Sequence, residues 1–244
     1  MANWSDPRTT ATGFGASTGV RDAAFDAGLR SHMLSVYNYM SSGVLLTGIV
    51  AMLFAGSGMA ADIMMGPGLM KYLIIFSPLA FVMVMSFGIN RLSTGAAQAL
   101  FWGFATVMGL SMSTIFLVYT GTSIAQTFFA TAAAFAGLSL FGYTTKKDLS
   151  GFGTFLIMGV VGLLVAMIIN IFLQSTVMDL AISAIGVLIF AGLTAYDTQK
   201  IKSMYAHVAG TDMVGKVVIM GALNLYLDFI NMFMFLLRFM GNRN

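Results

Sequence analysis

The chain has 244 residues, of which 58% are hydrophobic and only 9% are charged, and its mean hydropathy is +0.88. A soluble domain carries about 25% charged residues, so this chain has too few charged residues to form a surface that faces water. The absence of cysteine excludes disulfide frameworks, thiolate metal sites and cysteine nucleophiles. Composition alone therefore predicts an integral membrane protein.

Residues 1–35 differ from the rest of the chain because charged residues lie among Ser, Thr, Gly and Ala without a long apolar run. A secretory signal peptide needs a basic start followed by an apolar core, and this region has neither. We expect 1–35 to be a disordered cytosolic tail ahead of a membrane domain at 36–240. Residues 241–244 form a short C-terminal tail.

Apolar stretches of about 20 residues, the length that crosses a bilayer core of roughly 30 Å, recur from Val36 onward. Short polar breaks separate them, so neighbouring helices run antiparallel. The pattern predicts an all-α integral membrane protein with seven transmembrane helices. They are predicted at 36–56, 72–90, 98–119, 124–143, 152–173, 178–196 and 217–239.

The basic residues are sorted unequally between the two sides of this arrangement, with nine on the side of the N-terminus and three on the other. The positive-inside rule then places the N-terminus in the cytosol and the C-terminus outside. The sorting also explains the basic pI as a topology signal, so we expect the lipid bilayer, and no nucleic acid, as the partner. The nine are Arg8, Arg21, Arg30, Arg91, Lys146, Lys147, Lys200, Lys202 and Lys216, and the three are Lys71, Arg238 and Arg243.

One carboxylate lies deep within a predicted span. Asp228 is in the middle of 217–239, where an ionisable side chain costs at least roughly 2.5 kcal/mol without a partner or a water-filled cavity. Asn224 and Asn231 lie on the same helix face, because they are four residues before it and three after it. This polar stripe predicts that the C-terminal helix is central in the bundle. Hydrogen bonding between helices is the simpler explanation for the two Asn residues.

A second carboxylate, Asp197, follows the predicted span 178–196 at its inner end, with Thr194 on the same face. Pairing with Lys200, one turn later, would be an ordinary role for it. Arg91 ends the predicted span 72–90 on the same side. Its side chain can either extend to the lipid headgroups or turn inward to a carboxylate.

Two Asp residues on adjacent spans are compatible with three chemistries. They could bind a cation such as Ca²⁺, because carboxylates supply the hard oxygen ligands that it prefers, or they could relay protons. They could also form an intramembrane aspartyl protease dyad. Tyr196-Asp197 matches the first protease motif, but the bulky Leu225 and Leu227 stand where the second motif has glycines. We therefore expect no enzyme and no cofactor.

Three segments resemble the Bax inhibitor-1 family. Segments 225–231 (LYLDFIN) and 195–201 (AYDTQKI) are similar to its signature stretches, and 142–149 (GYTTKKDL) is similar to the loop after the fourth span in bacterial members. The resemblance covers about residues 36–240. It implies a seven-helix fold whose last helix is surrounded by the other six, and a bacterial inner membrane as its location.

The resemblance also implies a function, a pH-sensitive leak of Ca²⁺. In that family the paired aspartates, here Asp197 and Asp228, share a proton and form the gate, and Arg91 stands at the place of the Arg that latches the closed form. The pair is then a possible Ca²⁺ or proton site, with Asn224, Asn231 and Thr194 lining or bracing the path. The alternative is a stress-regulatory protein that binds other membrane proteins without transport.

The depths of the two aspartates conflict with direct pairing. Asp228 is predicted near mid-membrane and Asp197 at the inner end of its span, so straight, upright helices would hold them apart. Tilt, or an earlier start of the last helix, is needed to bring them together.

Overall fold

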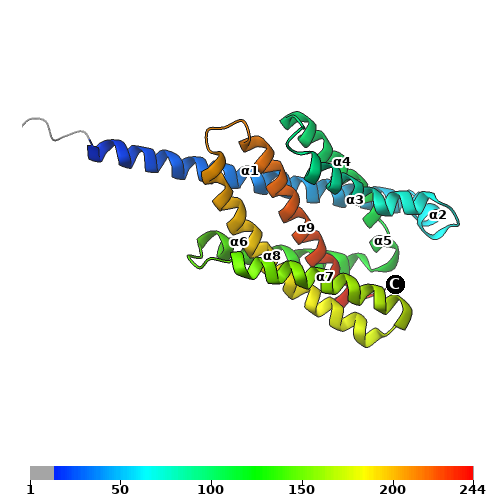
Figure 1. The fold of residues 1–244 in the computed structure, drawn as a ribbon. Helices are drawn as coiled ribbons and strands as arrows, with labels where there is room; N and C mark the ends of the chain where they lie inside the picture. The colour runs from blue at the N-terminus through cyan, green and yellow to red at the C-terminus, as the bar shows by residue number, and fades with distance from the viewer. Residues whose placement is uncertain (1–13, 244) are drawn as a thin grey trace, which may run out of the picture.

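The computed structural model describes residues 14–243, with side chains from Ala23 onward. Figure 1 shows long helices gathered into one bundle. Among the described residues, seven helical stretches are long and apolar enough to cross a membrane, α4 and α5 together making one, which confirms the predicted all-α fold. The helices are α1 (Phe14–Gly56), α2 (Met59–Met65), α3 (Met70–Gly88), α4 (Thr94–Met112), α5 (Ile115–Val118), α6 (Gly121–Thr144), α7 (Ser150–Leu173), α8 (Thr176–Val208) and α9 (Val214–Met240).

The C-terminal helix α9 is the centre of the bundle, as predicted. In its most apolar window 72% of the residues are buried, against 11% to 39% in the other spans of the described chain. It packs against α8, α1, α6 and α4 (Figure 1). Its 27 residues form one uninterrupted helix about 40 Å long, which is long enough to cross the whole hydrocarbon core.

Helix α1 begins well before the predicted first span. The chain is helical from Phe14 on, although 14–35 was assigned to the tail. The extra turns pack against the protein, because Met33 is buried and the buried His32 ring lies against Tyr205, with ring centroids 5.1 Å apart. The expectation of disorder for the first 13 residues concerns a part of the chain outside the described residues.

Helix α8 also continues beyond the predicted span, which ended at Tyr196. Polar residues end the apolar run there but not the helix, because the backbone hydrogen bonds of a helix continue through polar residues and some of their side chains reach partners. The Lys202 ammonium, for example, donates a hydrogen bond of 2.8 Å to the Tyr143 carbonyl. Asp197 consequently lies 11 residues, or about 16 Å, before the end of α8 at Val208. This extension removes the conflict in depth.

One side chain holds the loop between α6 and α7 against α8. The Gln199 amide donates 2.7 Å to the Lys147 carbonyl and accepts 2.8 Å from the Leu149 amide. Asp148 begins α7 by accepting from the Ser150 backbone amide at 2.9 Å. Hydrogen bonds from the Ser150 side chain and backbone hold the pKa of Asp148 below its usual value. The loop that resembles the bacterial family members is thus fixed beside Asp197.

A buried network of two hydrogen bonds joins α9 to α1 and α4. The Thr47 hydroxyl donates 2.8 Å to the Ala105 carbonyl and lies 2.6 Å from the Tyr226 hydroxyl. Because the Thr47 proton is used on Ala105, the Tyr226 hydroxyl is the donor to Thr47. The Tyr226 ring is fully buried and packs edge-on against Phe104 at 5.0 Å.

This network predicts that substitutions of Thr47 and of Tyr226 lower the stability of the protein by different amounts. Thr47→Val leaves the buried Tyr226 hydroxyl without a partner and should lower the free energy of unfolding by about 1–3 kcal/mol. Tyr226→Phe keeps the Thr47–Ala105 bond and should cost about 0.5–1.5 kcal/mol. Thermal unfolding in detergent measures both. Equal losses, or a larger loss for Tyr226→Phe, would contradict the assigned donor order.

Candidate functional site

The structure brings Asp197 of α8 and Asp228 of α9 together inside the bundle. Their carboxyl groups lie within hydrogen-bonding reach of each other. Asp228 is only 4% exposed, while Asp197 is half-buried. A carboxylate only accepts hydrogen bonds, so a bond between two carboxyl groups needs a proton on one of them. A hydrogen bond within the pair would therefore hold one proton and leave one negative charge.

Part of the pair is free to bind something else. The Asp228 Oδ2 atom is buried and accepts no hydrogen bond from the protein atoms that the structure describes, and the same is true of the neighbouring Thr198 hydroxyl. Buried polar atoms are normally satisfied by protein or by water. These oxygens can therefore accept from water or coordinate a passing cation.

The ligand set suits weak rather than tight cation binding. No group of three or more His, Cys, Asp or Glu side chains in the described chain is close enough to hold a metal ion. Ca²⁺ takes six to eight oxygen ligands, of which two carboxyl groups supply a minority. Backbone carbonyls, amide oxygens or water must supply the rest. Within the described residues, the two carboxyl groups alone therefore do not complete a Ca²⁺ site.

A positive charge on α8 itself acts on Asp197. Lys200, one turn after Asp197, exerts the electrostatic attraction on that carboxyl group. Its ammonium is exposed and lies 5.8 Å from the Tyr196 ring centroid, and it makes no direct ion pair with Asp197 within the described chain. Lys200 therefore attracts the Asp197 carboxyl group without forming a direct ion pair with it.

Arg91 does not pair with either carboxyl group among the described residues. It is exposed in the turn after α3, where its backbone amide donates 2.8 Å to the Gly88 carbonyl. Among the described side chains it forms no ion pair with either Asp197 or Asp228. A latch through Arg91 would belong to another conformation and stays a prediction.

Two of the other predicted site residues form hydrogen bonds within their own helices. The Asn231 amide donates 2.8 Å to the Leu227 carbonyl, and the fully buried Thr194 hydroxyl donates 2.8 Å to the Phe190 carbonyl. Asn224 is half-buried on α9. Of the polar stripe on this helix, Asp228 is thus the member that reaches a neighbouring helix through its side chain.

Two buried polar residues were not singled out from the sequence. Thr198 follows Asp197 directly, and Ser139 of α6 is likewise buried with its hydroxyl unpartnered among the described residues. A hydroxyl residue in an apolar helix is common, because it can bond the carbonyl one turn earlier. Only the packing of the helices shows that these two are not satisfied in that way.

Comparison with known proteins agrees with this arrangement. The family model described as "Inhibitor of apoptosis-promoting Bax1" matches residues 29–244. The chain belongs to the Bax inhibitor-1 family. The family match begins at residue 29, inside α1 and ahead of the predicted first span, which agrees with the early start of that helix.

Bacterial members of the Bax inhibitor-1 family are similar over most of their length. The inner membrane protein YbhL of Escherichia coli is 45% identical over 219 residues, which cover 89% of this chain and 94% of that protein. An uncharacterized protein of Rickettsia prowazekii is 46% identical over 228 residues, covering 93% and 96%. One of Caulobacter vibrioides is 44% identical over 230 residues, covering 90% and 92%. The resemblance seen in the motifs is therefore confirmed.

Proposed function

We propose that this protein is a pH-sensitive cation leak channel that passes Ca²⁺ across a bacterial inner membrane. The observation that carries the proposal is the close pair of carboxyl groups, Asp197 and Asp228, inside an apolar bundle. An intramembrane ionisable group is costly to bury and marks ion or proton paths. A pair that serves only to hold helices together could use amides at lower cost.

In the proposed mechanism protons and cations compete for the same oxygens. The unpartnered Asp228 Oδ2 is available to a cation, and protonation of the pair removes the charge that attracts it. Because α9 packs against four other helices, a change in the contact between α8 and α9 reaches most of the bundle. Asn224, Asn231 and Thr194 line or brace this path.

Arg91 is proposed to take part in a second conformation as a latch on the pair. Protonation would weaken the attraction of the pair for Arg91 and for the cation at the same time. Release of Arg91 opens the path and raises the flux, whereas loss of the bound cation lowers it, so the two effects change the flux in opposite directions. The proposal therefore predicts a response to pH whose sign is set by the larger of the two effects.

The cytosolic side is proposed from the basic residues, with the N-terminus inside and the C-terminus outside. The E. coli relative named an inner membrane protein supports the same membrane for this chain.

Calcium flux into proteoliposomes tests the proposal. We expect the purified protein to pass Ca²⁺ at a rate that differs several-fold between pH 8 and pH 6, while empty liposomes pass little at either. Arg91→Ala should alter that pH response, and Lys147→Ala, which removes another exposed charge outside the pair, should not. Flux no greater than in empty liposomes would overturn the proposal and leave the binding of other membrane proteins as the function to pursue.

A further inference from the structure

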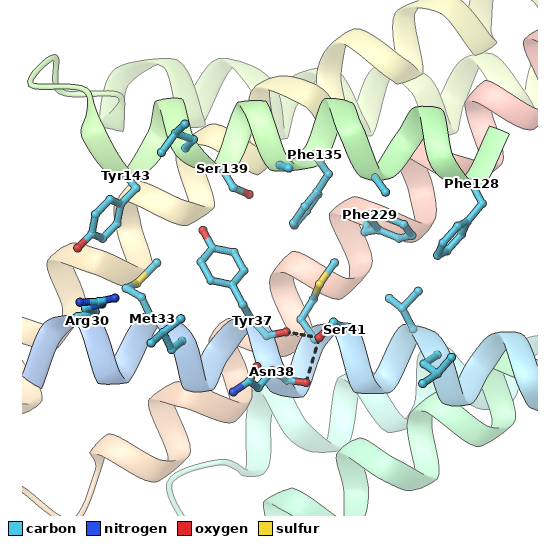
Figure 2. A pocket seen from close by; sticks show the side chains of 17 residues that line it. Arg30, Met33, Tyr37, Asn38, Ser41, Phe128, Phe135, Ser139, Tyr143 and Phe229 are labelled. Carbon is cyan, nitrogen blue, oxygen red and sulfur yellow. Dashed lines mark hydrogen bonds between the residues drawn. The ribbon is translucent and has the colours of Figure 1, made fainter. Parts of the chain in front are cut away.

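A long cleft runs along the lipid-facing side of the bundle between α1 and α6. It has a volume of about 920 Å³, near the upper end of the range for small-molecule sites. Both helices pack against α9, and Phe229 of α9 lies between them at the base of the cleft (Figure 2). The cleft is separate from the carboxyl pair, since neither Asp197 nor Asp228 lines it.

The two ends of the cleft differ in chemistry. Figure 2 shows Arg30 and Tyr143 facing each other across one end, with Phe128 at the other. Between them the lining is mainly apolar, as at Phe135 and Val44. The arrangement has the polarity of an amphiphile, with a cation at one end and a mainly apolar lining along the rest. That lining also includes the polar side chains of Asn38, Ser41 and Ser139.

The charged end is positive. Arg30 is exposed there, and the Lys202 ammonium lies 4.9 Å from the Tyr143 ring centroid. The acidic residue nearest in sequence to Arg30 is Asp26, one turn earlier and exposed, and no ion pair joins the two in the described structure. The guanidinium is therefore free to bind a phosphate, which its planar donors match well.

We propose that the cleft between α1 and α6 binds an anionic phospholipid, with an acyl chain along the apolar lining and the phosphate at Arg30 and Tyr143. The length agrees. From Arg30 to Leu45 the lining follows α1 for 15 residues, or about 22 Å, which exceeds the roughly 15 Å depth of one leaflet of the hydrocarbon core. The charged end of the cleft also lies at a depth that suits a lipid headgroup. The positive-inside topology puts Arg30 and Tyr143 at the cytosolic headgroup level, where anionic lipids attract basic residues.

A second cleft provides a contrast within the same molecule. It lies between α7 and α8, has a volume of about 470 Å³ and is lined only by apolar residues and glycines, including Phe155 and Ile185. Lipid chains can enter it as they enter any apolar groove in a bilayer. Because it carries no charge, it has no means of selecting a headgroup.

Photo-crosslinking in nanodiscs tests the proposal. The wild-type protein is placed in phosphatidylcholine nanodiscs that contain a small fraction of either phosphatidylglycerol or phosphatidylcholine with a diazirine in the acyl chain. Labelled peptides are then quantified by mass spectrometry. We expect peptides of α1 and α6 at the cleft to be labelled about fivefold more by phosphatidylglycerol, the factor that corresponds to about 1 kcal/mol for one basic residue. Peptides at the α7–α8 cleft should be labelled equally by both.

Two variants make the result specific. Arg30→Gln should bring the ratio at the α1–α6 cleft close to one, and it should fold normally because Arg30 is exposed. Lys147→Gln removes an exposed charge on the same side that does not line the cleft, and it should leave the ratio unchanged. A ratio near one in the wild type, or a preference that Arg30→Gln leaves intact, would overturn the proposal. Labelling confined to the α7–α8 cleft would also overturn it, because the α1–α6 cleft would then be filled by protein, such as a second copy.

Discussion

Asp228→Asn should abolish the pH dependence of Ca²⁺ flux, so that the several-fold difference between pH 8 and pH 6 falls to a ratio near one. The amide has the shape of the carboxyl group and can still hydrogen-bond to Asp197, but it cannot gain or lose a proton. The variant should therefore fold while losing the sensor. Flux in proteoliposomes at the two pH values, after a check of folding by size-exclusion chromatography and thermal unfolding, measures the effect.

If the two carboxyl groups act as a pair, their substitutions should not have additive effects on the pH response, as substitutions of two independent charges would. Asp197→Asn should have the same effect as Asp228→Asn, and the double variant should add nothing, because groups that share one proton act as a unit. Asp212→Asn is the matched control, since it removes an exposed carboxylate from the loop between α8 and α9. A folded Asp228→Asn protein with the wild-type pH response would contradict the assignment.

Gly142→Ala should lower the free energy of unfolding by about 1–3 kcal/mol, the usual cost of an added methyl group in a close-packed contact. A Cβ at Gly142 would overlap the Ala195 carbonyl oxygen and come within 2.9 Å of the Ala195 carbonyl carbon. Backbone cannot move aside as a flexible side chain can, so α6 and α8 must separate. Thermal unfolding in detergent measures the loss.

Gly137 provides the control on the same helix. A Cβ there meets no other atom of the described structure within 4 Å. Gly137→Ala should be neutral or stabilise the helix by up to about 1 kcal/mol, because Ala has the higher helix propensity. If Gly142→Ala unfolded at the same temperature as Gly137→Ala, the close contact between α6 and α8 would be wrong.

The contact at Gly142 also connects packing to the proposed gate. Ala195 is two residues before Asp197 on α8, so a displacement of α8 from α6 moves the carboxyl pair. Folded Gly142→Ala protein should accordingly show an altered pH response, whereas Gly137→Ala should behave as the wild type.

The number of spans and the central place of α9 could be predicted because both depend on the solvent that each residue meets. An apolar run of about 20 residues is required to cross the bilayer, and Asp228 in the middle of one requires that helix to face protein. These features are local in sequence and follow from the cost of polar groups in hydrocarbon. The pairing of Asp197 with Asp228 was implied by the resemblance to the Bax inhibitor-1 family, because the position of Asp197 alone was equally compatible with pairing to Lys200.

Helix ends could not be predicted in this way. Hydropathy indicates where a helix meets lipid, whereas α1 and α8 continue past that point into polar sequence and are held by packing, as His32 is against Tyr205. The cleft at Arg30 was likewise not visible in the sequence. Its lining comes from α1, α6 and α9, and each residue alone resembles an ordinary lipid-facing or headgroup-level side chain.

Infrared difference spectroscopy between pH 8 and pH 6 would test most directly whether a proton held between Asp197 and Asp228 controls the protein. The account predicts a carboxyl C=O band that changes with pH in the wild type and disappears in both Asp197→Asn and Asp228→Asn. It should persist in Asp212→Asn. A wild-type spectrum without such a band, or a band that survives in both pair variants, would contradict the account.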